Sequence, residues 1–359
     1  MPVTALLDLT QAALEAFVTQ ELGEPRFRAD QLWQWIWGKG AREFGQMTNL
    51  SRALREKLAA RADLAWPQVA VERQSADGTV KFLLVLGDGE RIETVLIPGA
   101  RGRYTQCIST QVGCPMACTF CNTGLLGFTR NLTHGEILGQ ILVGRDYLSR
   151  HRLEPLRNIV FMGMGEPLLN LANVLDALRS MNSDTGLNLS WRRSTVSTVG
   201  LPGPLEELGR SELALPAISL HAPNQELRAR IMPKAARVEL PELMAALDRF
   251  PMRPRERITF EYLLLKGVND TREHADQLAD LLDRRRHKVN LIRYNATVGI
   301  PYEAPGQERA EAFERRLWDR GLTATIRRSM GQDIEAACGQ LRAAVPDPGG
   351  YDDEDGGVA

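Results

Sequence analysis

The sequence of 359 residues has no uninterrupted apolar run of 18 or more residues, and no basic segment followed by an apolar core near its start. These absences argue against a transmembrane helix and against a secretory signal. Only 5 cysteines are present, an odd number, and three of them fall within eight residues. This distribution argues against a disulfide framework and favours a reducing compartment. We therefore expect a globular cytoplasmic protein that does not associate with membranes.

Net charge is also small, at -1. Residues 347–359 contain five acids and no Lys or Arg, so residues 1–346 carry 44 basic and 40 acidic side chains. This slight positive excess permits RNA binding, but it is far from the strongly basic composition that would predict it alone. The acidic segment 346–359 has too few apolar residues to bury a core, and we predict that it is a disordered tail.

The cysteine cluster Cys114-Pro-Met-Ala-Cys118-Thr-Phe-Cys121 is the most informative stretch of the chain. Three soft ligands at this spacing predict a metal or cluster site. A [4Fe-4S] cluster usually takes four thiolates, so three cysteines leave one iron open for a substrate or cofactor. The alternative is a zinc site completed by a distant His or Cys. It is less favoured, because closed zinc sites usually consist of two paired half-sites and no second Cys pair exists.

Two smaller units precede the main part of the chain. Residues 1–66 predict a helical accessory domain, with Leu32, Trp35 and Ile36 on one helical face. At this spacing the tryptophans are better explained as core residues than as stacking platforms for bases. Residues 67–100 change to strand-like periodicity with Asp-Gly turns, which predicts a short β-meander linker.

Residues 101–345 alternate between β-rich apolar runs and amphipathic helical stretches. The predicted strands are 158–162, 193–197, 214–220, 258–265, 288–294 and 323–327; the predicted helices lie near 133–149, 170–182, 239–249, 271–286 and 307–320. This alternation predicts an α/β fold with a parallel sheet, and its six repeats suggest a partial (β/α)6-type barrel. In such barrels the chemistry takes place at the C-terminal ends of the strands.

Polar residues follow several of the predicted strands. Gly163 and Gly165 allow the backbone to approach a ligand closely, and the carboxylate of Glu166 can accept from an amine or a hydroxyl. Each polar residue alone is as likely to cap the following helix. Together on one rim, Ser197-Thr198, Ser219-Leu220-His221 and Tyr294-Asn295 suggest a site for a nucleoside-like cofactor.

Two isolated cysteines and one carboxylate complete the candidate residues. An isolated cysteine such as Cys107 or Cys338 is usually a small buried hydrophobe. Gly339 directly after Cys338 is expected to end a helix and expose the thiol, which favours a reactive role. Glu93 lies near the start of a predicted strand, and its local sequence alone does not mark it as a base.

The cysteine motif followed by Phe161-Met-Gly-Met-Gly-Glu-Pro167 resembles the radical S-adenosylmethionine (SAM) superfamily. Over nearly the whole chain, the segments around Cys107, Ser219 and Cys338 further resemble the RlmN/Cfr family of radical SAM RNA adenine methyltransferases. The resemblance implies that one [4Fe-4S] cluster is bound by Cys114, Cys118 and Cys121. It also implies that SAM binds the open iron and is held by Gly165, Glu166, Ser197, Ser219, Leu220, His221 and Asn295.

The resemblance implies a role for each remaining candidate. Cys338 would be the methyl carrier, Cys107 its resolving partner and Glu93 a base. One SAM would donate the methyl group and a second would generate the radical, with an electron donor such as flavodoxin or ferredoxin. Adenine C2 is electron-poor and cannot attack a sulfonium methyl group, which is why a radical route is needed.

The implied activity is methylation of C2 of an adenosine in the peptidyl-transferase region of 23S rRNA and of the adenosine 3′ to the tRNA anticodon, by a monomeric enzyme. A transient protein–RNA crosslink would form on Cys338. The alternatives are a Cfr-type C8 methyltransferase and a non-catalytic iron–sulfur or zinc protein that binds RNA or senses redox state. The N-terminal helical unit favours the C2 type. Candidate phosphate contacts are Arg192, Arg193, Arg284–Arg286, Lys288, Arg327 and Arg328.

Overall fold

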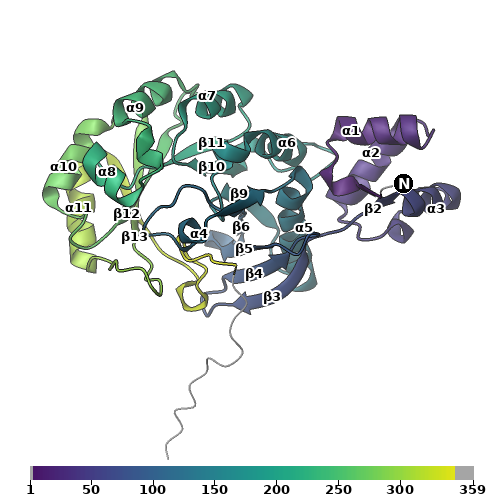
Figure 1. The fold of residues 1–359 in the computed structure, drawn as a ribbon, viewed down its shortest axis with the longest axis horizontal. Helices are drawn as coiled ribbons and strands as arrows, with labels where there is room; N and C mark the ends of the chain where they lie inside the picture. Colours follow the sequence, from purple (N-terminus) through teal and green to yellow (C-terminus); the bar gives the residue numbers. More distant parts are fainter. Residues whose placement is uncertain (1–2, 344–359) are drawn as a thin grey trace, which may run out of the picture.

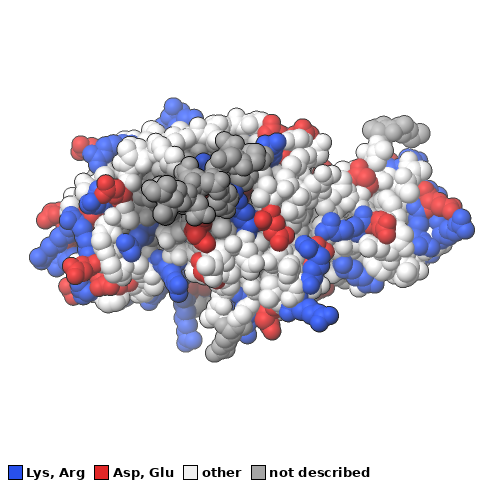
Figure 2. Space-filling view, turned by 90° about the horizontal axis from the view of Figure 1, so that it is seen from below, with Lys and Arg blue, Asp and Glu red and all other residues white. Residues whose placement is uncertain are grey.

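The computed structural model describes residues 3–343 and not the side chain of Arg101, so the predicted tail at 346–359 lies outside the described residues. A helical N-terminal unit and a larger α/β part lie along the long axis of the molecule (Figure 1). No helix within residues 3–343 is both long enough and apolar enough to cross a membrane. Basic and acidic side chains are interspersed over the face shown in Figure 2, which agrees with the small net charge.

The N-terminal unit contains α1 (Gln11–Ala16), α2 (Phe27–Trp33) and α3 (Arg52–Arg61). Thr10 caps α1 by accepting a hydrogen bond from the backbone amide of Ala13 at 3.3 Å. The short strands β1 (Thr4–Ala5) and β2 (Ala62–Asp63) pair in parallel and bring the two ends of the unit together.

Two tryptophans of this unit, Trp33 and Trp37, lie in its core, as predicted. Trp33 and Trp37 are 1% and 0% exposed and lie four residues apart, on one face of the helix. Trp35 is partly buried and packs against the same hydrophobic core as Leu32 and Ile36, in agreement with the predicted face. The outer side of its ring packs under Lys39 Nζ, 3.7 Å from the ring centroid.

One ten-stranded sheet organises the rest of the chain, in the order β14-β13-β12-β11-β10-β9-β6-β5-β4-β3. All neighbours from β6 to β14 pair in parallel, which confirms the predicted α/β barrel-like class. The strands are β3 (Gln68–Gln74), β4 (Val80–Val85), β5 (Arg91–Pro98), β6 (Tyr104–Cys107), β9 (Leu156–Phe161), β10 (Ser194–Thr198), β11 (Leu215–Ser219), β12 (Ile258–Leu264), β13 (His287–Arg293) and β14 (Thr323–Arg327). The sheet is open, because within the described residues β14 and β3 have no further neighbour.

The predicted β-meander is present, but it is not a separate linker. Strand β5 pairs antiparallel with β6, so β3, β4 and β5 extend the barrel sheet (Figure 1). The physical reason is that the free edge of β6 would otherwise leave unpaired backbone groups. This extension places Glu93, on β5, in the same sheet as Cys107, on β6.

Helices follow most of the parallel strands and cover the outer face of the sheet (Figure 1). They are α5 (His134–Arg150), α6 (Leu171–Met181), α7 (Pro202–Ser211), α8 (Gln225–Ile231), α9 (Leu240–Arg249), α10 (Arg272–Leu281) and α11 (Gln307–Asp319). We did not predict α7, because Pro202, Gly203 and Pro204 resemble a turn; Pro202 instead occupies the first helical turn, where its missing N–H costs nothing. Helix α10 ends before the predicted 286, because Asp283 accepts hydrogen bonds from the amides of Arg285 and Arg286 and forms a turn.

The N-terminal unit contacts α5 through partly buried hydrogen bonds. Arg145 donates to the carbonyl oxygens of Trp37 and Gly38 at 2.9 and 3.2 Å. The amide of Gly135 donates to Asp8 Oδ1 at 3.1 Å, and a Cβ at Gly135 would lie only 2.5 Å from that oxygen. The absence of a side chain at Gly135 therefore allows the two units to approach each other.

Gly135→Ala is expected to lower the free energy of unfolding by about 1–3 kcal/mol, because the added methyl group overpacks this contact. Gly203→Ala is the matched control, since Gly203 also lies in the first turn of a helix but has no atom within 4 Å of an added Cβ. It should be neutral or stabilising by up to about 1 kcal/mol. Urea unfolding measures both effects; equal stabilities of the two variants would contradict the assignment.

Candidate active site

The three motif cysteines and Cys338 line one cavity of about 160 Å³ at the C-terminal ends of the parallel strands, which we call the inner cavity. The predicted rim residues Gly165, Glu166, Ser197, Ser219 and His221 also line it. The sequence-distant Cys114 and Cys338 are thus brought together. Leu220 and Asn295, predicted for the same site, are not among its lining residues.

The cysteine loop runs from β7 (Gln111–Gly113) to α4 (Asn122–Leu125). Burial is the main cause that raises the pKa of Cys118 well above its ordinary value, so the thiolate would need a compensating positive charge. Within residues 3–343, no three His, Cys, Asp or Glu side chains converge to hold a single metal ion. A four-iron cluster instead attaches each cysteine to a different iron atom, and the buried soft donors fit such a cluster.

The two glycines after β9, Gly163 and Gly165, are also required for packing. An added Cβ at Gly163 would lie 2.7 Å from the carbonyl oxygen of Ile108, and one at Gly165 would lie 2.7 Å from Cβ of Gln111. Gly165 also has a φ of +107°, which disfavours a side chain. These glycines therefore allow close packing against the segment that leads into the cysteine loop. Any contact of Gly165 with a ligand would be made by its backbone.

Glu166 is 3% exposed and is anchored by three donors. Its Oε1 accepts from Thr198 Oγ1 at 2.5 Å and from the Leu168 amide at 3.0 Å, and its Oε2 accepts from the Val199 amide at 2.9 Å. Burial raises the pKa of this carboxyl group, although these hydrogen bonds act in the opposite direction. One lone pair on Oε2 remains for a donor such as an ammonium group in the inner cavity.

His221 is held as a neutral imidazole. Its Nδ1 accepts from the Leu263 amide at 3.1 Å, and burial, followed by the charge of Arg228, lowers its pKa to about 3. Because Nδ1 is an acceptor, the proton lies on Nε2, and the ring can donate to a ligand. Leu220 instead turns its side chain into the hydrophobic core, at 0% exposure.

Cys338 lies in an irregular segment, not at the end of a helix as predicted. Gly339 does adopt a left-handed conformation, with a φ of +86°, and the thiol is half-buried. Asn295 fixes this segment: its Nδ2 donates to the Cys338 carbonyl at 3.2 Å, while its Oδ1 accepts from Gln332 at 2.7 Å. We call residues 331–342, which carry Cys338, the Cys338 segment. In this arrangement Asn295 holds the Cys338 segment instead of lining the inner cavity.

Glu93 contacts the same segment from the other side. It is 2% exposed, lies 3.1 Å from Lys81 Nζ, and accepts from the Arg342 amide at 2.9 Å. Lys81 also donates to the Glu335 carbonyl at 3.0 Å. Residues on both sides of Cys338 therefore contact one buried ion pair.

Cys107 ends β6 and is 7% exposed. Burial is the main cause that raises the pKa of its thiol to about 12. Register places Cys107 opposite Val95, two residues from Glu93 on β5. Because Glu93 contacts the segment that carries Cys338, this pairing places Cys107 on the strand next to that contact.

Sequence reasoning missed two buried charged residues. Lys81 and Glu261 are single charged residues within otherwise apolar strands, a signal that could have identified both.

The predicted phosphate contacts lie at both ends of the sheet. Arg284–Arg286 and Lys288 lie at the amino end of β13, away from Cys338, and Arg286 donates to carbonyl groups at the end of α9. Arg192 and Arg193 likewise precede β10. Of the predicted phosphate contacts, only Arg327 and Arg328 lie at the end of the sheet that carries the site.

Comparisons with known proteins agree with this geometry. Residues 4–64 match the family described as ribosomal RNA large subunit methyltransferase N-terminal domain, and residues 108–282 match the radical SAM superfamily. The chain is 58% identical to the dual-specificity RNA methyltransferase RlmN of Nitratidesulfovibrio vulgaris strain DP4, over 95% of this chain and 96% of the relative. Identity to the enzyme of the same name from Oleidesulfovibrio alaskensis is 57%, over 94% and 96%. The crystal structure of a radical SAM methyltransferase from Sphaerobacter thermophilus superposes with a TM-score of 0.90 at 42% identity, over 95% of this chain and 100% of that one.

The open parallel sheet and the cysteine loop beside it are those of a radical SAM enzyme, a class that uses a [4Fe-4S] cluster and SAM. Within that class, the extent and level of identity show that the chain belongs to the RlmN family of RNA methyltransferases.

We expect Cys338 to be alkylated by iodoacetamide well before Cys107 in the reduced protein without its cluster. With a pKa of about 12, only about one Cys107 in ten thousand is a thiolate at pH 8, and the buried site restricts access further. The rate at Cys107 should rise about tenfold per pH unit between pH 7 and 9. Timed mass spectrometry of the two peptides measures both rates, and similar rates at pH 8 would contradict the described burial of Cys107.

Proposed function

We propose that this protein methylates C2 of an adenosine in 23S rRNA and of the adenosine 3′ to the tRNA anticodon. The observation that carries the proposal is the convergence of Cys107, Cys338 and Glu93 beside the cysteine loop. A radical SAM enzyme needs three cysteines for its cluster, so two further cysteines near each other require a separate explanation. Membership of the RlmN family supports the same assignment.

Cys338 is the methyl carrier in this proposal. Its half-buried thiol lines the inner cavity with the cluster-binding cysteines and with His221. When bound, the cluster and SAM supply the methyl group, and they also supply a radical that can remove hydrogen from the methyl carbon attached to the Cys338 sulfur. The groups of this chain that would hold SAM are the Oε2 of Glu166, the Nε2–H of His221 and the hydroxyls of Ser197 and Ser219, which lie 3.3 Å apart. Asn295 supports the carrier by holding its backbone.

Release of the product is assigned to Glu93 and Cys107. Glu93 takes the proton from C2 of the crosslinked base as the unpaired electron of the adduct passes to a one-electron carrier such as the proposed flavodoxin or ferredoxin. Cys107 then attacks the Cys338 sulfur. The sulfur–sulfur bond forms as the bond between Cys338 and the methylene carbon breaks, and that carbon takes up a proton to become the methyl group. Cys107 must lose its proton in this step, because burial keeps it a thiol beforehand.

The proposal includes a cytoplasmic location, a monomeric enzyme and an electron donor such as flavodoxin or ferredoxin. The N-terminal helical unit supports the C2 product over the C8 product of Cfr-type enzymes. Nucleoside analysis of the modified RNA distinguishes 2-methyladenosine from 8-methyladenosine.

Protein expressed in cells should carry a methyl group on Cys338, detectable in the mass of the peptide that spans it. A Cys107→Ala variant should retain RNA covalently attached to Cys338, because nothing resolves the crosslink. A Cys338→Ala variant is the control and should retain none. An unmodified Cys338 together with no trapped RNA in Cys107→Ala would refute the proposed function.

A further inference from the structure

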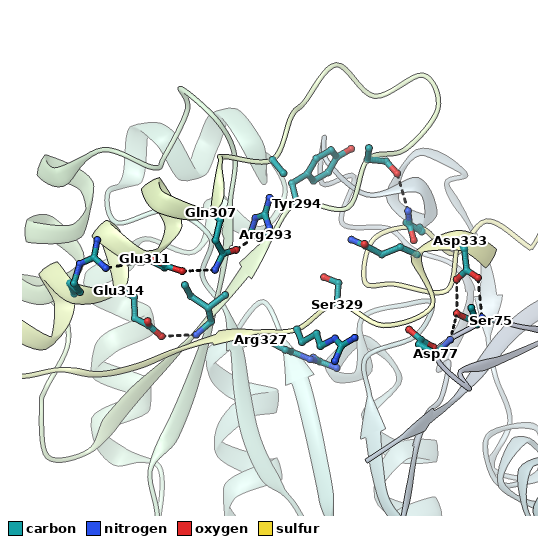
Figure 3. A pocket seen from close by; sticks show the side chains of 18 of the residues that line it. Ser75, Asp77, Arg293, Tyr294, Gln307, Glu311, Glu314, Arg327, Ser329 and Asp333 are labelled. Atoms are coloured by element: carbon teal, nitrogen blue, oxygen red, sulfur yellow. Dashed lines mark hydrogen bonds and ion pairs between the residues drawn. The ribbon is translucent and has the colours of Figure 1, made fainter. Parts of the chain in front are cut away.

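Arg327 separates two cavities. It ends β14 and lines the inner cavity with Cys338, and it also lines an outer cavity of about 1280 Å³. The outer cavity lies between α11 and the turn that joins β3 to β4, where Glu314 and Asp77 lie on opposite sides of Arg327 (Figure 3). Within residues 3–343, no other side chain lines both cavities. Arg327 is therefore the side chain that borders both the outer cavity and the cavity of Cys338.

The donors of Arg327 are almost unused. A guanidinium group has five N–H donors, and the only side-chain hydrogen bond of Arg327 to the described residues is a 3.8 Å contact from Nη1 to Met162 Sδ, a weak acceptor. The nearby Cys338 sulfur, as a thiolate, raises the pKa of Arg327 against the effect of burial, and a guanidinium group is positively charged in any case. Arg327 is half-buried, and a cation with unused donors at such a position can bind a ligand that accepts from them.

Glu261 supports this arrangement from deeper in the barrel. It is 3% exposed, and its Oε1 accepts from Asn290 at 3.0 Å, while its Oε2 has no hydrogen-bond partner among the described residues. Register places Glu261 opposite Asn290, and Arg327 opposite Ile292, one layer nearer the mouth. Burial raises the pKa of the Glu261 carboxyl group, and this group lies behind the guanidinium without occupying its donors.

We propose that Arg327 is a catalytic residue that donates hydrogen bonds to a ring nitrogen beside C2 of the target adenine. This inference rests on the proposed function. In adenine, C2 is bonded to N1 and N3, and both nitrogens are hydrogen-bond acceptors. When C2 approaches the carbon attached to the Cys338 sulfur, one of them faces the side chains that surround Cys338. Arg327 is the cation among the lining residues of the inner cavity.

The contact has a chemical consequence. A cation bonded to N1 or N3 withdraws electron density from C2 and favours addition of the carbon radical attached to the Cys338 sulfur. One electron of the new carbon–carbon bond comes from that radical and one from the ring π system. The unpaired electron therefore passes into the ring, and the added density falls partly on the nitrogen that Arg327 contacts. Stabilisation of charge that develops during the reaction is a large catalytic effect.

Arg327→Gln in the cluster-reconstituted enzyme tests the proposal, with an rRNA fragment that contains the target adenosine. Crosslink formation in a Cys107→Ala background should fall about 10- to 100-fold, the range expected for a lost charged hydrogen bond. Methylation of Cys338 should stay within about twofold, because it precedes contact with the base. Arg327→Lys should recover part of the lost rate. Arg315→Gln is the control, since Arg315 lines the outer cavity but not the inner cavity. This variant should form the crosslink at the unsubstituted rate.

Two modified RNAs identify the contact. Replacing the target by 1-deazaadenosine or 3-deazaadenosine removes one ring nitrogen each. In the enzyme with Arg327, one of these two RNAs should crosslink more slowly than unmodified RNA, by a factor similar to the effect of Arg327→Gln on unmodified RNA. In the Arg327→Gln variant, that same RNA should crosslink no more slowly than unmodified RNA.

An unchanged crosslinking rate in Arg327→Gln would overturn the proposal. The proposal would also be overturned if Arg327→Gln slowed crosslinking of both deaza RNAs as much as it slows unmodified RNA. A fall in Cys338 methylation as large as the fall in crosslinking would show instead that Arg327 acts on the thiol. Failure of the proposed function is distinguishable, because the enzyme with Arg327 intact would then give no crosslink with unmodified RNA.

Discussion

The segment that carries Cys338 has little regular structure, so its position depends on hydrogen bonds from the sheet that surrounds it. Asp77 and Asp333 connect it to the turn between β3 and β4: Gly331 N donates to Asp77 at 2.8 Å, and Ser75 Oγ donates to Asp333 at 2.5 Å. Asn295 holds it from the opposite edge of the sheet. The open sheet becomes a nearly closed site because this segment spans its gap.

Buried charges give the site its chemical character. Lys81 and Glu93 form an ion pair that is 7% and 2% exposed at its side chains, and both partners also bond to the backbone of the Cys338 segment. Removing one partner of such a pair leaves an uncompensated buried charge. The pair therefore connects the segment to β4 and β5. On the other side of the site, Glu261 and Arg327 form no ion pair with each other among the described residues, which leaves polar atoms of both available to a ligand.

Much of the fold and part of the site could be predicted from the sequence. The alternation of apolar runs and amphipathic stretches identified β9 to β14, because each strand has a buried side and each helix an apolar face. The spacing of Cys114, Cys118 and Cys121 identified the cluster site. Helix α7 was missed because its first turn contains Pro202 and Gly203, for which local signals are ambiguous.

The remaining features depend on contacts between distant parts of the chain. The contact between Glu93 and Arg342 joins residues 249 positions apart. Asn295 looked like a cofactor ligand because it follows a strand, but its amide bonds to the Cys338 segment. Neither pairing leaves a local pattern in the sequence. Lys81 and Glu261 did leave one, since a lone charge in an apolar strand requires a buried partner or a ligand.

Amide hydrogen exchange across residues 331–342 tests most directly whether the β3–β4 turn holds the Cys338 segment. Asp333→Asn weakens the bonds to Ser75 and Ala76, and Asp88→Asn is the matched control, since Asp88 lies in the next hairpin turn and bonds to Arg130. We predict that Asp333→Asn speeds exchange in residues 331–342 and slows Cys338 methylation, while exchange in β9 to β13 and the Asp88→Asn variant stay unchanged. Unaltered exchange and methylation in Asp333→Asn would contradict the claim that these contacts position the methyl-carrying cysteine.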